Sequence, residues 1–325
     1  TARFDESGNQ TGHTGSGIKT QQYHLQGEES WRTFTGSSFT VTANGTYEVR
    51  LTDLAGNSET YTVAVDKIDA TAPEAELSVP TADGSDGWFQ SQTVDITVAY
   101  EDGSNGTESG DPSGIDSAKY AFVTGDSAAP KEEDLVDLPA SGQKVTLGQE
   151  SNGTYYLYYK VTDKAGNVTS GFSNAIRKDP ASPTMNVAAA STGANAADGV
   201  QFTVSASGFG PSGGKLLAGS GESIGSEQME VIGSCDGSGT SISDKTYTAK
   251  NPGTYYFQYV TGSGITDSET RYVRKVTFDS RGGTEVSAQL VWTTRMENSS
   301  AAEAECKVVR PVNPVRTGHT FKGWF

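Results

Sequence analysis

Short stretches of alternating polar and apolar residues recur along the whole chain, and glycine, asparagine and aspartate separate them. An alternation with a period of two residues places the apolar side chains on one face of a β-strand. The clearest of these stretches predict strands at 73–79, 94–100, 118–123, 144–147 and 154–161. The best helical candidate is the segment 299–308, SSAAEAECKV, and it is short. The pattern therefore predicts an all-β protein.

Internal repeats organise these strands into modules. The string NGTY at 44–47, followed by DLAGN at 53–57, recurs as NGTY at 152–155 and DKAGN at 163–167, about 108 residues further on. A weaker third copy keeps NPGTYYFQY at 251–259 and has SGITDS at 263–268 in place of the AGN turn. A repeat of this length indicates tandem supersecondary units rather than one large fold.

Each repeat has the strand lengths and turns of an immunoglobulin-like sandwich. Asn152-Gly153 supplies the positive φ of a tight turn, and Gly166 is predicted at a left-handed position in a hairpin that Asp163 caps. We predict tandem Ig-like β-sandwiches and the following domains: a partial Ig-like domain at 1–69, an Ig-like domain at 70–181, a divergent Ig-like domain at 182–275, and a separate module, truncated, at 276–325.

Two family resemblances follow from the motifs. The combination of NGTY, D-x-A-G-N and D-x-T-A-P, which covers roughly residues 1–275, resembles the bacterial Ig-like domains of cell-surface adhesins. The strings VTFDSRGGTEV at 276–286 and PVNPVRTGHTFKGWF at 311–325 resemble the internalin-type B-repeat, or Listeria-Bacteroides repeat. The segment 292–307 is longer than the middle of that family. The resemblances imply a partial β-grasp-like B-repeat and an extracellular location, on the bacterial cell surface or secreted.

Charge limits the partners. The formal net charge is −16, from 40 acidic and 24 basic residues, which disfavours nucleic acid and anionic membranes. No apolar run approaches 18 residues, so we expect no membrane insertion within the chain. The chain begins at Thr1 without a signal-peptide pattern, and we expect it to be a monomeric part of a longer protein. Cys235 and Cys306 are too few for a disulfide framework.

The sequence contains one match to a catalytic motif. The string GPSGG at 210–214 matches G-x-S-x-G and would make Ser212 a nucleophile. That reading needs a following helix and a histidine partner, but the third module contains no histidine. His13, His24 and His319 are scattered and have no metal-ligand spacing. We therefore predict no catalytic residues, no cofactor and no enzyme.

Carboxylates are the remaining site chemistry, because oxygen ligands on loops can hold calcium. The first candidate group lies in one Gly-rich loop and contains Glu101, Asp102, Glu108, Asp111 and Asp116. The second lies at the joints between modules, where Asp69 beside Asp53, or Asp179 beside Asp163, could share an ion. Acidic loops are commonly only solvated, so the metal ligands stay unassigned.

Two functional hypotheses remain open, and a third is weaker. The chain is a stalk of spacer modules in an adhesin, or one module binds a host glycan or protein through loops at 102–114 or 125–142. The third is that these are accessory domains of a secreted glycan-degrading enzyme. The Asn-x-Thr sequons coincide with Asn-Gly turns, which explains most of them without glycosylation, and tryptophans occur at about one per module.

Overall fold

The computed structural model of the chain describes residues 15–103, 112–222, 229–295 and 306–325. These residues form strands and loops with two single-turn 3₁₀ helices, η1 (Ser85–Gly87) and η2 (Glu132–Asp134). The all-β class and the Ig-like architecture are confirmed. The helical candidate at 299–308 falls largely outside the described residues, and Cys306 and Lys307, which are described, are not helical.

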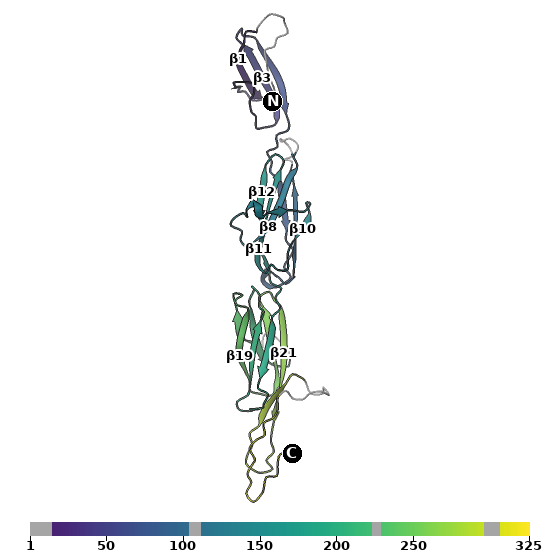
Figure 1. The fold of residues 1–325 in the computed structure, drawn as a ribbon, viewed down its shortest axis with the longest axis vertical. Helices are drawn as coiled ribbons and strands as arrows, with labels where there is room; N and C mark the ends of the chain where they lie inside the picture. The colour runs from purple at the N-terminus through teal and green to yellow at the C-terminus, as the bar shows by residue number, and fades with distance from the viewer. Residues whose placement is uncertain (1–14, 104–111, 223–228, 296–305) are drawn as a thin grey trace. The chain divides into compact units, whose positions relative to one another are not determined.

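The first module forms one antiparallel sheet in the order β2-β1-β3-β4. Its strands are β1 (Ile18–Leu25), β2 (Arg32–Thr33), β3 (Gly45–Asp53) and β4 (Ser58–Val65). Figure 1 shows β1 and β3 side by side, and their register pairs Tyr23 with Val49. The side chains of Tyr47 and Val49 are buried on one face of β3, as its alternating pattern predicts.

The second module forms two sheets, in the orders β10-β7-β5 and β6-β13-β11-β8-β9, with β12 paired to β11. Its strands are β5 (Glu74–Ser78), β6 (Trp88–Phe89), β7 (Val94–Glu101), β8 (Ile115–Val123), β9 (Val136–Asp137), β10 (Gln143–Leu147), β11 (Gly153–Asp163), β12 (Val168–Phe172) and β13 (Ile176–Lys178). All five strands predicted for this module are present.

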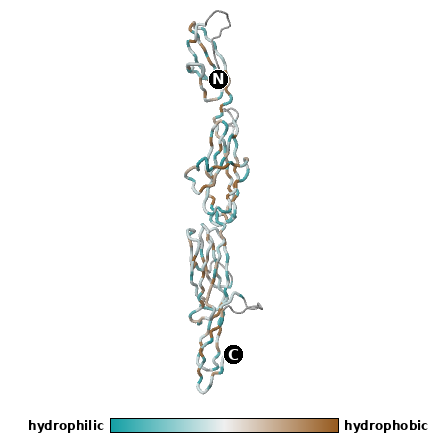
Figure 2. Tube along the Cα trace, in the orientation of Figure 1, coloured by the Kyte–Doolittle hydropathy of each residue, from teal (hydrophilic) through white to brown (hydrophobic). Residues whose placement is uncertain are grey.

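The third module also has two sheets, in the orders β14-β16-β19 and β15-β22-β21-β20-β17-β18. Its strands are β14 (Thr184–Ala189), β15 (Ala194–Asn195), β16 (Val200–Ser207), β17 (Gly214–Ser220), β18 (Met229–Cys235), β19 (Ser241–Ala249), β20 (Gly253–Thr261), β21 (Thr266–Val276) and β22 (Gln289–Thr293). Buried residues alternate with more exposed ones along β16 and β20, which is the pattern of strands with one face in a core. Figure 2 shows hydrophobic and hydrophilic residues interspersed along the trace.

By its contacts the chain divides into two compact units. One contains residues 1–79, 96–145 and 157–173, and the other contains residues 80–95, 146–156 and 174–325. The second module contributes residues to both units. The contacts of the segment 66–73 lie within the first of these units, and those of the segment 176–183 lie within the second.

The repeated turn has the same structure in all three modules. The backbone N–H of Asp53 donates to the carbonyl of Asn57, and Asp163 and Thr261 make the same bond to the fourth residue after them. The first residue of each turn also caps the turn through its side chain, with a carboxylate in two modules and the hydroxyl of Thr261 in the third. Gly166 has a φ of 95°, as predicted for the left-handed position. The repeat seen in the sequence is therefore a repeat of the hairpin.

The segment after residue 275 is joined to the third sandwich. β22 pairs antiparallel with β21, with Trp292 opposite Val273. Leu290, Trp292 and Cys306 are buried in the same hydrophobic core as Phe202. The indole N–H of Trp292 also donates to the carbonyl of Ala190 at 2.9 Å. Residues 289–293 therefore supply part of the core of the third module, although the repeat motifs begin at residue 276.

Candidate cation site at the joints between modules

The two joints between modules are built on one plan. We define the first joint as residues 66–73 and the second joint as residues 176–183. In the first, Asp69 accepts hydrogen bonds from the backbone N–H of Thr71 at 3.0 Å and of Ser113 at 2.8 Å. In the second, Asp179 accepts from Ala181 at 3.0 Å and from Ser212 at 2.9 Å.

Ser113 and Ser212 occupy equivalent places in their modules, each within a Pro-Ser-Gly string. The aspartate of each joint therefore binds the Pro-Ser-Gly turn of the module that follows it. These hydrogen bonds lower the pKa of Asp69, the bonds from Ser113 first, because they favour the ionised carboxylate.

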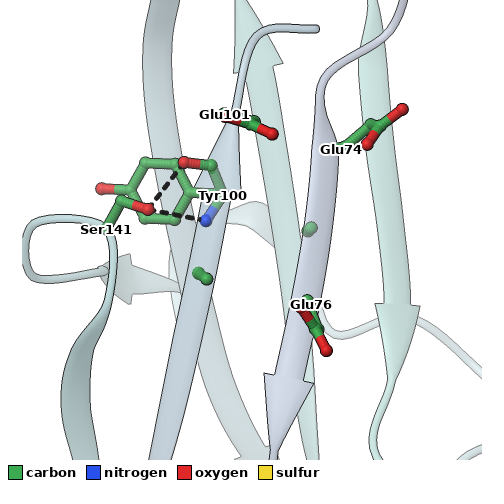
Figure 3. Close-up of a pocket in the computed structure, with 7 residues that line it drawn as sticks. Glu74, Glu76, Tyr100, Glu101 and Ser141 are labelled. Atoms are coloured by element: carbon green, nitrogen blue, oxygen red, sulfur yellow. Dashed lines mark hydrogen bonds between the residues drawn. The ribbon is translucent and has the colours of Figure 1, made fainter.

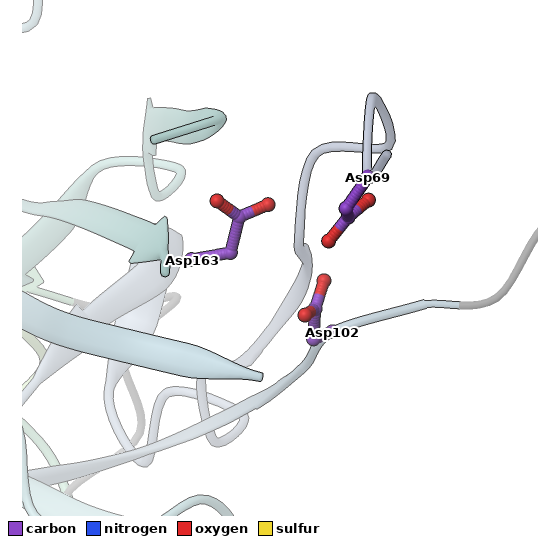
Figure 4. A group of neighbouring side chains, drawn as sticks. All are labelled: Asp69, Asp102 and Asp163. Atoms are coloured by element: carbon purple, nitrogen blue, oxygen red, sulfur yellow. The ribbon is translucent and has the colours of Figure 1, made fainter. Parts of the chain in front are cut away.

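Two further aspartates surround Asp69 at the first joint. Asp102 follows β7, Asp163 ends β11, and one carboxylate oxygen from each of the three residues lies within 4.8 Å of the other two. Figure 4 shows Asp102 and Asp69 with their carboxylates toward each other and Asp163 facing the same space. Asp163 is 2% exposed, whereas Asp69 and Asp102 are half-buried. Like charges this close repel one another strongly in a partly buried site.

One carboxylate oxygen of this group has no hydrogen-bond partner among the described residues. Both oxygens of Asp163 accept from Asn167, at 2.8 Å each, and Oδ2 of Asp102 accepts from the N–H of Gly114. Oδ1 of Asp102 is buried and has no hydrogen-bond partner among the residues that the structure describes. A buried, partnerless carboxylate oxygen is costly, and a hard cation would satisfy it.

The second joint shows that the fold does not need these acids. The β5–β7 register pairs Glu74 with Glu101, and the β14–β16 register pairs Thr184 with Ser207. The residues that follow are Asp102 in the second module and Gly208 in the third. The counterpart of Asp163 in the third module is Thr261. The third module therefore keeps the joint aspartate but lacks the other two carboxylates.

The donor set fits calcium better than zinc, because it contains carboxylate oxygens and no histidine or cysteine. The Nζ of Lys164 lies close to Gly114, since a Cβ atom built on that glycine would be 3.4 Å from it. Asp69, Asp102 and Asp163 are the residues that would hold a cation.

The other predicted ligands among the described residues do not belong to this group of three. Asp53 binds Asn57 in its own turn. Asp116 lies on β8, and Glu108 and Asp111 fall outside the described residues. The group therefore contains Asp69 and Asp163, one residue from each predicted pair. The pairing of Asp69 with Asp53 and of Asp179 with Asp163 stays a prediction. The repeat could have indicated that Asp69 and Asp163 lie together, because it aligns Asp69 with the joint aspartate Asp179 and places Asp163 at the end of a module.

Glu101 lines a shallow groove on the β5–β7 sheet, with a volume of about 270 Å³. Figure 3 shows it beside Glu74 and Glu76, with the Tyr100 backbone bonded to the Ser141 hydroxyl. β5 is an edge strand, where exposed charges discourage pairing with another sheet.

The predicted binding loop at 125–142 is attached to its own sheet. Glu132 accepts hydrogen bonds from Lys119 at 2.8 Å and from Lys160 at 2.7 Å. These two lysines lower the pKa of Glu132 to about 2. Within the same loop β9 pairs with β8. The loop is therefore held against the outer face of β8 and β11.

Ser212 has a structural role. Its hydroxyl accepts a hydrogen bond from the N–H of Ser263 at 2.9 Å, and its own N–H binds Asp179. The sequon asparagine Asn44 also has a structural role, since its side-chain N–H donates to the carbonyl of Ile68 and its Oδ1 accepts from the N–H of Ile68. Cys235 and Cys306 are free thiols.

Comparison with known proteins supports the C-terminal assignment. Residues 275–325 match the family model of the Listeria-Bacteroides repeat domain, which confirms the resemblance read from the motifs. No curated protein matches the chain. The described residues contain no helix long and apolar enough to cross a membrane.

Several solved structures of tandem β-domains are similar to the chain at low identity. A tetra-tandem repeat in the extending region of a large adhesion protein is 15% identical, with a TM-score of 0.31, over 86% of this chain and 74% of that chain. The FN1–FN3 domains of chicken CNTN1 are 13% identical, with a TM-score of 0.20, over 77% and 90% of the two chains. Similarity at this level does not support an argument about function.

Proposed function

We propose that this chain is a non-enzymatic spacer array from a bacterial surface or secreted protein that takes part in adhesion. The observation that carries the proposal is the repeated joint, in which Asp69 and Asp179 make the same two hydrogen bonds. A stalk needs such joints, because they attach each module to the next. The modules then add length without having to bind a partner themselves. The match of residues 275–325 to a repeat family of surface proteins supports the same role.

We further propose that calcium binds at the first joint, through Asp69, Asp102 and Asp163. The buried and partnerless Oδ1 of Asp102 supports this assignment, as does the loss of two of the three acids at the second joint. Bound calcium would remove the repulsion among three carboxylates and connect the joint to β7 and β11. It would stiffen the stalk rather than take part in a reaction.

Small-angle scattering of the chain with calcium and with chelator tests both proposals. A spacer array gives an extended particle under both conditions, with a broader distance distribution after chelation if calcium stiffens the first joint. A compact particle under both conditions contradicts the spacer function and favours the alternative of a binding module for a glycan or a protein. An extended particle with identical curves supports the spacer and contradicts the calcium site.

A further inference from the structure

Lys178, the last residue of β13, has a fully buried side chain. Its ammonium Nζ donates to the carbonyl oxygens of Gly148 at 2.8 Å, Gln149 at 3.1 Å and Ser151 at 2.9 Å. The amide Oδ1 of Asn152 lies 3.4 Å from the same nitrogen. We name these four oxygens the oxygen cradle. Three carbonyl acceptors match the three N–H bonds of an ammonium, whereas a neutral amine has two.

Burying this charge has a cost that the cradle offsets. Desolvation lowers the pKa of Lys178, and the nearby carboxylate of Glu150 acts in the opposite direction. An ammonium removed from water is stable only when protein acceptors replace its hydration. At the first joint the residue before the joint aspartate is apolar: Ile68 precedes Asp69, whereas Lys178 precedes Asp179 at the second joint. The second joint is therefore the one with a charged group at this place.

The neighbouring residue binds the other side of the joint. Asp179 is fully buried, and its two carboxylate oxygens accept from Ala181 and from Ser212 of the third module. A Cβ atom on Gly210 would come within 2.0 Å of Oδ1 of Asp179, so only glycine fits there. Two adjacent residues thus hold the second module, through Lys178, and the third, through Asp179.

A second contact crosses the same joint. The carbonyl of Ser263 accepts from the N–H of Ser85 at 2.7 Å and from the side-chain amide of Gln90 at 2.7 Å. Gly264, in the same turn, has a φ of 96°, and a Cβ there would lie 2.5 Å from the hydroxyl of Ser85. The turn at 261–265 of the third module therefore packs directly on the segment 84–90 of the second.

The two joints differ in charge. At the first joint the carboxylate of Asp69 lies with those of Asp102 and Asp163, and the backbone of Ile68 binds the side-chain amide of Asn44. The second joint has one carboxylate, Asp179, and the buried ammonium of Lys178. At the second joint a buried side chain of the protein itself, that of Lys178, therefore carries the positive charge.

We propose that Lys178 is a tethered cation that holds the second joint in one geometry, so that this joint keeps its contacts without a bound metal ion. The loop 148–152 stays closed around the ammonium. β13 is thereby fixed at its end, and Asp179 is presented to the third module. The proposal does not depend on calcium at the first joint.

Hydrogen exchange measured by mass spectrometry tests the proposal with K178M, which keeps the length of the side chain and removes its charge. Amide exchange in 81–90, 148–152 and 210–214 is expected to rise at least about tenfold, or about 1.4 kcal/mol of local opening free energy. Exchange in β16 and β20 is expected to stay unchanged. The control K67M removes an exposed lysine of the first joint and leaves the second joint unaffected. Unchanged exchange at the joint in K178M, or an equal rise in β16 and β20, contradicts the proposal.

Chemical rescue tests whether the ammonium group is sufficient when it is not covalently attached to the chain. In K178A, propylammonium is expected to restore protection of 148–152 and 210–214, because its three N–H bonds fit the empty cradle. Tetramethylammonium has no N–H bond and is expected to have no effect. A K178A chain that folds only with propylammonium supports the same conclusion. Absence of rescue in both the folded protein and the refolding reaction overturns it.

Chelation distinguishes this proposal from the calcium site. In the wild-type chain, chelator is expected to leave exchange at the second joint unchanged. A rise there on chelation overturns the tethered cation, whereas a change confined to the first joint concerns only the proposed calcium site.

Discussion

The side-chain amide of Asn167 donates to the carboxylate of Asp163 at 2.8 Å and to the backbone carbonyl of Asp69 at 3.2 Å. One residue thus caps a hairpin turn and binds the preceding joint. Its counterpart in the first module, Asn57, caps its own turn through Asp53 in the same way. The asparagine that caps the turn in both modules therefore also binds the joint in the second module.

Replacing Asn167 by alanine is expected to destabilise the second module more than Asn57→Ala destabilises the first. Both variants lose the cap on an aspartate, but only Asn167→Ala also loses the bond to Asp69. Each net hydrogen bond contributes about 0.5–1.5 kcal/mol, so the two losses should differ by about 1 kcal/mol. Urea unfolding of the two variants measures this difference. Equal losses would show that the contact with Asp69 contributes nothing.

Calcium is expected to raise the unfolding temperature of the wild-type chain. A ligand at 100 times its dissociation constant stabilises the folded state by about 2.7 kcal/mol. Asp102→Asn should abolish this gain, and in chelator it should not destabilise the chain, because it removes one of three repelling charges. Asp116→Asn, at an exposed position on β8, is the control and should keep the calcium response. Scanning calorimetry of the three chains with and without calcium gives six unfolding temperatures, and a calcium gain retained in Asp102→Asn excludes that residue as a ligand.

The loop at 125–142 is expected to detach from its sheet in acid. The pKa of Glu132 is about 2 in the folded protein, below its ordinary value of 4.5, because Lys119 and Lys160 bind the carboxylate. The ion pairs that depress this pKa stabilise the fold fully above about pH 4.5, and their contribution is lost as the pH falls through about 2. Proteolysis of the loop by pepsin between pH 4.5 and 2 measures the release.

Glu132→Gln is the matched variant for the loop. It keeps the size of the side chain and removes the titrating group, so cleavage of the loop should be faster than in the wild type at pH 4.5. Its rate should then change little between pH 4.5 and 2, apart from the pH dependence of pepsin itself, which an unstructured peptide substrate measures. A wild-type chain with the same flat profile would show that the two ion pairs do not hold the loop.

Trp292 is expected to be required for the third sandwich, although it lies within the predicted C-terminal repeat. It is 8% exposed, and its ring centroid lies 6.0 Å from that of Phe202. Trp292→Ala should cost about 3–5 kcal/mol, the range for a large aromatic residue removed from a core. Val312→Ala, at a position that is 87% exposed, should change stability by less than about 0.5 kcal/mol. Unfolding followed by circular dichroism compares the two, and a small effect of Trp292→Ala would separate the C-terminal segment from the third sandwich.

Most of the fold could be predicted from the sequence, because its signals are local. The alternation in β7 and β10, the Asn-Gly pair before β11 and the glycine at 166 each act within a few residues. The C-terminal family could be recognised for the same reason. The placement of 289–293 could not, because the pairing of β22 with β21 depends on which strand edge is open in the folded third module.

The candidate site divides in the same way. The sequence by itself determined the repeat, the strands, the turns and the aspartate at each joint, since these follow from short-range backbone preferences and from composition. Only the tertiary structure decided that Asp102 and Asp163 meet Asp69, and that Lys178 fills a cradle of carbonyl oxygens. These residues come from strand ends and loops far apart in the chain. Their approach is set by strand register and by the packing of one module on the next, which no local pattern encodes.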